Sequence, residues 1–126
     1  LDHFKQINDT YGHDQGDRVL QAVVAQVRGR LRRSDTFARW GGEEFLILAP
    51  ETTGPDAVAL AETLRTALRA LPRPEGGSIT ASFGVAAYQP EETLDQWLKR
   101  ADEWMYASKR QGRDRVSGDE IDPAGR

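Results

Sequence analysis

Residues 39–48 read Arg39-Trp40-Gly41-Gly42-Glu43-Glu44-Phe45-Leu46-Ile47-Leu48 and place two adjacent carboxylates between a glycine pair and an apolar run. Two glycines supply the backbone angles of a tight turn, so the segment predicts a β-hairpin whose second strand, Phe45 to Leu48, is buried on both faces. Burying adjacent carboxylates at a strand edge is costly unless a cation neutralises them, and Mg²⁺ or Mn²⁺ suits such oxygen ligands. The alternative for this segment alone is a surface hairpin with solvated glutamates.

The composition indicates one domain and excludes several classes of protein. A chain of 126 residues is long enough to bury a core, and its net charge of −3 argues against binding nucleic acid or a membrane surface through bulk charge. It has no cysteine, hence no disulfide or thiolate metal site, which fits a reducing cytoplasm. No apolar stretch approaches a membrane span. Because the sequence opens at Leu1 without Met or a signal-like segment, we expect that upstream residues are missing from it.

Hydrophobic periodicity predicts the elements around the hairpin. Helices are expected from Asp17 to about Leu31, from Pro55 to Leu71 and from an N-cap at Thr93 to a stop at Gly112. Strands are expected at Phe37 to Arg39, Glu44 to Leu48, Ser78 to Ala86 and Arg115-Val116. The expected inner stripes of the three helices are Leu20, Val23, Val24, Val27 and Leu31; Val58, Ala61, Leu64, Leu68 and Leu71; and Leu94, Leu98, Ala101, Met105 and Ser108.

This order predicts an α+β domain over residues 1–116, followed by a disordered tail over residues 117–126. It corresponds to a ferredoxin-like β-α-β-β-α-β core with an antiparallel sheet flanked by helices, but without the first strand. That strand is normally central, so its absence would leave the backbone groups of its neighbours without partners.

Three segments together resemble the GGDEF domain, the diguanylate cyclase family, in its Gly-Gly-Glu-Glu-Phe form. They are residues 1–17, Gly41 to Phe45, and residues 100–113. The resemblance implies a palm-type core that condenses two GTP into cyclic di-GMP and releases two pyrophosphates. It implies a homodimer, because each subunit holds one GTP and two active sites must face one another. It also implies an N-terminal sensor or regulatory domain, and a cytoplasmic location even where an upstream segment attaches the parent protein to a membrane.

The resemblance makes Glu43 and Glu44 the catalytic and metal-binding carboxylates for Mg²⁺ or Mn²⁺, with the backbone carbonyl of Leu1 as a further metal contact. Attack of a ribose 3′-hydroxyl on an α-phosphate needs an activated nucleophile and a neutralised phosphate, and metal ions held by carboxylates provide both. The family's other metal-binding Asp falls just before Leu1 and is absent from this sequence.

The resemblance also implies a GTP site. Asn8 and Asp17 match the family's guanine-reading pair, and a carboxylate can accept from the N1–H and 2-amino groups of guanine. The alternatives are a turn-forming Asn8 and an Asp17 that stabilises the start of a helix. The other implied GTP-binding residues are His3, Phe4 and Lys5, Gly41 and Gly42 of the hairpin, and the phosphate-binding pair Lys109 and Arg113. Phe4 is equally a core residue, and Lys109 and Arg113 equally suit a charged helix end.

Arg32-Arg33-Ser34-Asp35 stands at the spacing of the family's inhibitory RxxD site, where product binds away from the active site. Arg32 can pair with phosphate and Asp35 can read a guanine edge, and Arg65 is a weaker candidate for an additional arginine. The alternative is a helix end with a following cap.

For the whole chain, two further functions stay open. One is a domain that binds GTP or cyclic di-GMP without turnover, and the other is a related cyclase or polymerase-like palm with another base preference.

Overall fold

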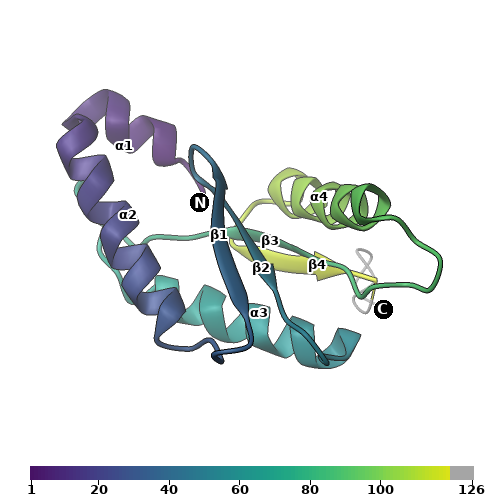
Figure 1. The fold of residues 1–126 in the computed structure, drawn as a ribbon. Coiled ribbons are helices and arrows are strands. Elements are labelled where there is room, and N and C mark those ends of the chain that lie inside the picture. Colours follow the sequence, from purple (N-terminus) through teal and green to yellow (C-terminus); the bar gives the residue numbers. More distant parts are fainter. Residues whose placement is uncertain (120–126) are drawn as a thin grey trace. The chain divides into compact units, whose positions relative to one another are not determined.

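The computed structural model describes residues 1–119, and the expectation for residues 120–126 lies outside this range. The elements are α1 (Phe4–Tyr11), α2 (His13–Arg28), β1 (Thr36–Gly41), β2 (Glu44–Leu48), α3 (Gly54–Leu68), β3 (Ser82–Val85), α4 (Leu94–Arg110) and β4 (Arg115–Gly118) (Figure 1). This confirms the α+β class. No helix within residues 1–119 combines the length and apolar character needed to cross a membrane. The chain divides into two compact units.

The first unit comprises Leu1–Pro50 and Thr66–Thr80. Helices α1 and α2 pack together, and Gly12, with a φ of 88°, makes the sharp turn between them. The buried apolar side chains of the unit are Phe4, Ile7, Val19, Leu20, Val23, Val27, Ala67, Leu68 and Ile79. These positions in α2 follow the 3.6-residue period of its apolar stripe, so burial of that stripe accounts for the helix.

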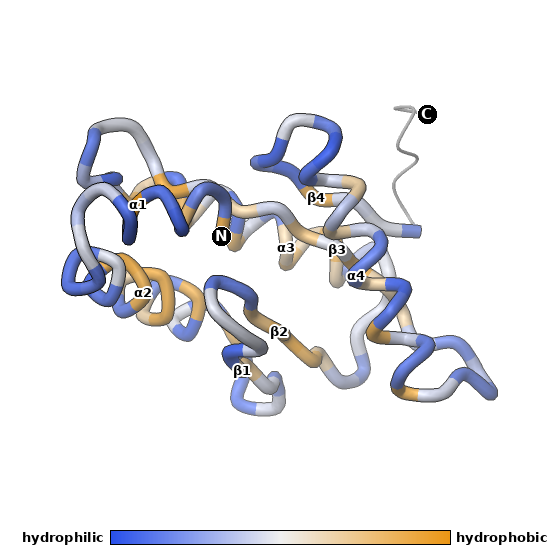
Figure 2. The backbone as a smooth tube through the Cα atoms, turned by 90° about the horizontal axis from the view of Figure 1, so that it is seen from above, coloured by the Kyte–Doolittle hydropathy of each residue, from blue (hydrophilic) through white to orange (hydrophobic). Residues whose placement is uncertain are grey.

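Strands β1 and β2 form the predicted hairpin. They pair antiparallel from Thr36↔Leu48 to Arg39↔Phe45, and an irregularity at the turn precedes Gly42, which has a φ of 47°. The rings of Phe37 and Phe45 stack at 5.3 Å. Figure 2 shows the apolar character of β2, yet Glu44–Leu48 are all only half-buried, so the prediction of a strand buried on both faces is wrong. Within residues 1–119 β2 pairs with β1 alone, and strand burial depends on such partners.

The second unit comprises Glu51–Arg65 and the chain from Ala81 onward. Strands β3 and β4 run parallel, in register from Ser82↔Arg115 to Val85↔Gly118, and α4 packs on both. The strands therefore form two two-stranded sheets, rather than one antiparallel sheet as expected. The reason for the parallel pair is the 17-residue helix α4, which returns the chain to the same end before β4 begins.

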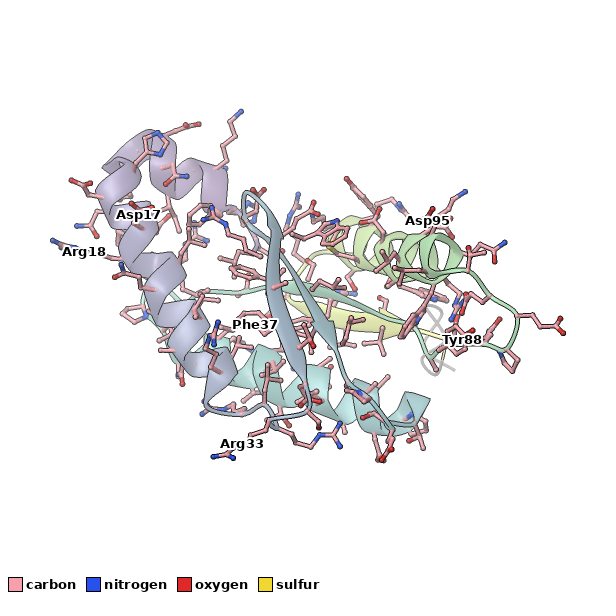
Figure 3. The ribbon with its side chains drawn as sticks, in the orientation of Figure 1. Asp17, Arg18, Arg33, Phe37, Tyr88 and Asp95 are labelled. Carbon is pink, nitrogen blue, oxygen red and sulfur yellow. The ribbon has the colours of Figure 1, made fainter. Side chains whose placement is uncertain are left out.

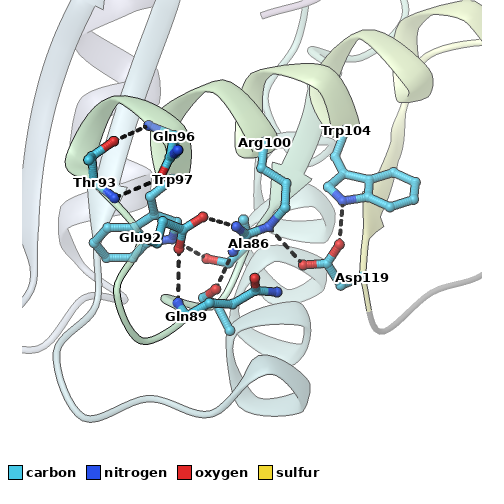
Figure 4. A network of polar contacts seen from close by, with 10 residues as sticks. Ala86, Gln89, Glu92, Thr93, Gln96, Trp97, Arg100, Trp104 and Asp119 are labelled. Carbon is cyan, nitrogen blue, oxygen red and sulfur yellow. Dashed lines mark hydrogen bonds and ion pairs between the residues drawn. The ribbon is translucent and has the colours of Figure 1, made fainter.

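Polar contacts fix the loop before α4 onto that helix (Figure 4). Thr93 and Gln96 form a capping box, which confirms the predicted N-cap. Trp97 Nε1 donates to the Ala86 carbonyl at 2.7 Å. Arg100 pairs with Glu92, donates to the Ala87 carbonyl and reaches Asp119 at 3.1 Å. These contacts bind both the loop and the end of β4 to one face of α4.

Several elements differ from expectation. Strand β3 begins at Ser82 rather than Ser78, because Ser78 pairs with Pro72 in an isolated bridge, and α3 ends at Leu68 rather than Leu71. Helix α1 is not predicted by the periodicity, and α2 begins at His13, four residues before Asp17. Leu94, expected on the inner side of the last helix, is 59% exposed because it is the first helical residue and precedes the packed turns. Strand β4 extends to Gly118, so Ser117 and Gly118 are buried strand residues rather than part of a disordered tail.

Candidate active site

Glu43 and Glu44 lie where the hairpin turns, and both are half-buried. Gly42 provides the left-handed backbone of the turn, and Arg39 Nε donates to its carbonyl at 2.8 Å. A side chain added at Gly41 or Gly42 would meet nothing within 4 Å, so space is open beside both glycines. The turn therefore presents two adjacent carboxylates next to open space.

Leu1 lies against this hairpin. Its amino group donates to the Glu43 carbonyl at 2.9 Å. The next residue, Asp2, is buried, its amide donates to the Thr80 carbonyl at 2.9 Å, and its carboxylate accepts from the Thr80 hydroxyl at 2.8 Å. The backbone that leads into α1 is thus held in place from both sides within the first unit.

The donor chemistry of the hairpin suits a hard metal ion. Two carboxylates and a backbone carbonyl of the neighbouring Leu1 are all oxygen donors, which Mg²⁺ and Mn²⁺ prefer. Across residues 1–119 no three His, Asp or Glu side chains gather into a metal-holding group. A metal at the hairpin would therefore depend on Glu43 and Glu44 for its charged ligands from the described chain.

Packing of α1 on α2 brings the Asn8 side chain against Gly16, the residue before Asp17. A Cβ placed on Gly16 would lie 1.8 Å from Asn8 Oδ1, so the Asn8 side chain occupies the space that the glycine leaves. Asp17 follows Gly16 directly and is exposed, as is Arg18 (Figure 3). Asn8 thus offers a side-chain amide packed against Gly16 of α2, and Asp17 offers an exposed carboxylate.

The alternative interpretations of this pair do not fit the structure. Asn8 lies inside α1 rather than in a turn, and its carbonyl accepts the Gly12 amide at 2.9 Å. The first turn of α2 carries Asp14 as its acid, whereas Asp17 is in the second turn, too far along to be the acid that stabilises the helix start.

His3, Phe4 and Lys5 begin α1. His3 has a φ of 57° and makes no side-chain cap, so the first amides of the helix have no capping side chain from that residue. Phe4 is 5% exposed, and its side chain belongs to the core, leaving only its backbone for ligand contact. Lys5 is exposed.

Lys109 and Arg113 belong to the second unit. Lys109 lies in the last turn of α4, with its ammonium 5.1 Å from the centre of the Tyr106 ring, a cation–π contact that restricts the lysine. Arg113 is exposed and has a φ of 65°. Both cations are therefore near the end of α4, as the sequence predicts.

Arg32 and Asp35 form a turn beyond α2, which ends at Arg28, so they do not cap that helix. Arg32 Nη2 lies 2.9 Å from Asp35 Oδ1 and also donates to the Pro50 carbonyl at 2.9 Å. The Asp35 side chain is 1% exposed, while that of Arg32 is 54% exposed. Hydrogen bonds from Arg32 lower the pKa of Asp35, so the pair's small contribution to stability is present above the ordinary aspartate pKa and lost as pH falls through the lowered value.

Arg65 makes ion pairs with two acids of the second unit. Its guanidinium lies 3.0 Å from Glu62 and 3.1 Å from Asp114, and its side chain is 21% exposed. Hydrogen bonding to Glu62, opposed by burial and aided by Asp114, raises the pKa of Arg65. The Arg65 guanidinium thus forms ion pairs with two carboxylates of its own unit.

Sequence reasoning missed three residues that support these groups: Gly16, Asp2 and Tyr106. Tyr106 stands three residues before Lys109, and that helical spacing was an available signal. Gly16 and Asp2 lie within the motif of residues 1–17, but their roles depend on contacts that only the folded chain shows.

A family model described as "Diguanylate cyclase, GGDEF domain" matches residues 1–115. The chain is 44% identical to diguanylate cyclase DgcP of Pseudomonas aeruginosa over 119 residues, covering 92% of this chain and 18% of that protein. It is 42% identical to diguanylate cyclase DgcM of Escherichia coli over 120 residues, covering 91% of this chain and 28% of that protein. The chain thus spans less than a third of either relative.

The fold is shared with solved structures. The GGDEF domain of DgcB from Caulobacter crescentus, in complex with c-di-GMP, superimposes with a TM-score of 0.86 at 34% identity. The match covers 94% of this chain and 73% of that one.

Proposed function

Because the chain belongs to the GGDEF domain family of diguanylate cyclases, we propose that it condenses two molecules of GTP into cyclic di-GMP. The 3′-hydroxyl of one GTP loses its proton and bonds to the α-phosphorus of the other. The bond between the α and β phosphates breaks, and pyrophosphate leaves with the electron pair. A second, reciprocal step closes the ring and releases the second pyrophosphate.

The observation that carries the proposal is the fit of Asn8 against Gly16, directly before Asp17. The Asp17 carboxylate can accept from the N1–H and 2-amino groups of guanine, while the held amide of Asn8 donates or accepts at the same edge. Adenine offers no such pair of donors and would leave the carboxylate without partners. This chemistry supports GTP as the substrate.

Glu43 and Glu44 are the residues that we propose hold Mg²⁺ or Mn²⁺, with the Leu1 carbonyl as an added contact. When bound, the ion neutralises phosphate charge and lowers the pKa of the attacking hydroxyl. The half-buried carboxylates support this assignment, as does the hydrogen bond from the Leu1 nitrogen to the backbone carbonyl of Glu43, which places Leu1 beside the hairpin.

Positively charged side chains and backbone amides are the groups that we propose bind the phosphates of GTP. We propose that the backbone amides of His3 and Phe4, with the Lys5 ammonium, bind phosphate at the start of α1. Lys109 and Arg113 are proposed as further phosphate ligands, and Gly41 and Gly42 leave space beside the carboxylates.

Because one subunit contributes one GTP, the proposal also requires two copies of the domain to face each other. We propose the cytoplasm as the location, because the substrate GTP is available there.

Gly16→Ala tests the base-recognition part of the proposal. The new methyl group would displace the Asn8 side chain, whose Oδ1 lies 1.8 Å from its position, and would press lightly on the Phe4 ring at 3.3 Å; all three nearest atoms belong to side chains. GTP affinity should therefore fall by about tenfold, or roughly 1.4 kcal/mol, with the fold retained. Calorimetric titration with the α,β-methylene analogue of GTP, which cannot release pyrophosphate, measures the effect.

The matched control is Gly29→Ala at the other end of α2, where a Cβ would come no closer than 3.4 Å to the Ala25 carbonyl. This variant should bind the analogue as tightly as the unmodified protein. If Gly16→Ala also binds it equally well, Asn8 does not read the base in the position that the structure gives it.

A second site for the product is proposed at Arg32 and Asp35. The exposed guanidinium of Arg32 can pair with phosphate, and it is already oriented by Asp35 and the Pro50 carbonyl. A ligand at this turn acts as a feedback inhibitor if its binding and GTP turnover are coupled. The three-residue separation and the mutual contacts of the pair support this proposal.

Arg32→Ala should weaken binding of cyclic di-GMP by about tenfold, or roughly 1.4 kcal/mol, because it removes a charge-assisted contact to phosphate. GTP affinity should stay unchanged, and turnover should resist accumulated product. The control is Arg33→Ala, since Arg33 is the exposed neighbouring arginine and keeps the net charge matched (Figure 3). Calorimetry with both nucleotides measures the result, and equal product affinity in the two variants would remove Arg32 from the site.

Comparison of GTP with ATP tests the substrate directly. The α,β-methylene analogue of GTP should bind at least about a hundredfold more tightly than that of ATP, because Asp17 would remain unpaired against adenine. Equal affinities would instead favour a related palm domain with another base preference. Tight binding of both GTP and cyclic di-GMP by a dimeric protein that never turns over would favour the receptor function.

A further inference from the structure

The turn after α4 holds three successive residues in left-handed backbone conformations. Gly112 has a φ of 118°, Arg113 of 65° and Asp114 of 46°. Glycine adopts such angles freely, but Arg113 and Asp114 do so at a cost in free energy, because the Cβ crowds the backbone. Such a conformation persists only where surrounding contacts hold it.

Several contacts hold this turn within the second unit, and three of them involve Arg113 and Asp114. The Arg113 amide donates to the Ser108 carbonyl at 3.0 Å, and the Arg113 carbonyl accepts from Arg115 Nε at 3.0 Å. The Asp114 carboxylate accepts from Arg65 Nη1 at 3.1 Å, across 49 residues of sequence. The first two contacts are local, so the ion pair with Arg65 is the one among them that ties the turn to α3.

The remaining contacts of Arg65 make it a rigid support. Its Nε and Nη2 atoms donate to Glu62 Oε2 at 3.1 and 3.0 Å, one turn earlier on α3. The guanidinium is therefore fixed on its own helix while Nη1 holds Asp114. The side chains of Arg65 and Asp114 are 21% and 28% exposed, so water screens this pair less than a surface pair.

We propose that Arg65 is a positioning residue for GTP binding, which acts through Asp114 to hold Arg113 in the conformation that contacts phosphate. This inference rests on the proposed function, in which Arg113 is a phosphate ligand. It gives Arg65 a different role from that of an additional arginine of the product site, because its donors are already engaged by Glu62 and Asp114. Loss of Arg65 would let the turn relax toward less strained angles and carry Arg113 away from the phosphate.

The test measures binding of the α,β-methylene analogue of GTP and of guanosine, which has no phosphate, to the full-length protein. Arg65→Ala should weaken binding of the analogue by about fivefold and leave guanosine binding unchanged. Asp114→Asn, which keeps the shape but loses the charge, should give a similar loss. Arg65→Lys, which retains a charged donor, should restore part of the affinity. Glu103→Gln, the same charge-neutralising change at an exposed residue of α4 outside every proposed site, is the matched control and should bind normally.

A double-mutant cycle with Arg113 separates positioning from general damage. If Arg65 acts through Arg113, adding Arg65→Ala to Arg113→Ala should cause no further loss of analogue affinity. A full further loss, or an equal loss for guanosine, would overturn the positioning role. Unchanged analogue affinity in Arg113→Ala alone would overturn the phosphate role of Arg113 and this inference with it. An unmodified protein that binds no analogue would overturn the proposed function itself.

Discussion

Glu43→Gln is expected to lower the rate of cyclic di-GMP formation by about a thousandfold or more, because a bound metal ion strongly stabilises the charge that develops during phosphoryl transfer. The substitution keeps the size of the side chain but removes its charge. Glu43 sits half-buried on the turn, and no group of three metal-binding side chains in residues 1–119 stands ready to replace it. The initial rate of product formation at saturating GTP and Mg²⁺, followed by chromatography, measures the loss.

Glu103→Gln is the matched control, since Glu103 is an exposed glutamate on α4 outside every proposed site. Its rate should equal that of the unmodified protein. If Glu43→Gln keeps a rate within about threefold of that control, Glu43 does not hold a catalytic metal.

Gly84→Ala should cause the largest loss of stability. Gly84 lies in β3 directly against α4, where an added Cβ would stand 2.0 Å from the Ala101 carbonyl oxygen and 2.3 Å from the Met105 nitrogen. Both are backbone atoms, so no side-chain rotation relieves the overlap and the helix must move off the strand. The free energy of unfolding should fall by about 3 kcal/mol or more, lowering the melting temperature by roughly 10 °C.

Thermal unfolding followed by circular dichroism tests this prediction. Gly29→Ala again serves as the control, because its nearest contact is an ordinary one at 3.4 Å. A melting temperature of Gly84→Ala within about 2 °C of the control would show that β3 and α4 do not pack as closely as described.

The parts of the fold that local signals determine were predictable from the sequence. The hairpin follows from its glycine pair between apolar residues, and the start of α4 follows from the capping pair of Thr93 and Gln96. Helix α1 was not predictable by the same means, because Asn8, Asp9 and Thr10 favour turns and the helix depends on packing against α2. The exposure of β2 likewise depends on partners rather than on its apolar sequence.

The candidate site likewise contains residues that the sequence predicts and contacts that it does not predict. The sequence predicts the identity of its charged residues, because Glu43, Asp17 and Lys109 stand in motifs of fixed spacing. It does not predict the role of Gly16, since a missing side chain says nothing about which neighbour fills its space. Nor does it predict the pairing of Arg65 with Asp114, which links residues 49 positions apart. Such contacts follow from tertiary packing alone.

Conversion of two GTP molecules into one cyclic di-GMP is the activity that we propose for this domain. The most direct measurement incubates the full-length protein with GTP or ATP in the presence of Mg²⁺ or Mn²⁺ and separates the products by chromatography, with pyrophosphate measured in parallel. We expect cyclic di-GMP and two pyrophosphates per product from GTP, and no cyclic dinucleotide from ATP. Equal use of ATP, or no product from a folded and dimeric protein supplied with GTP and metal, would contradict it.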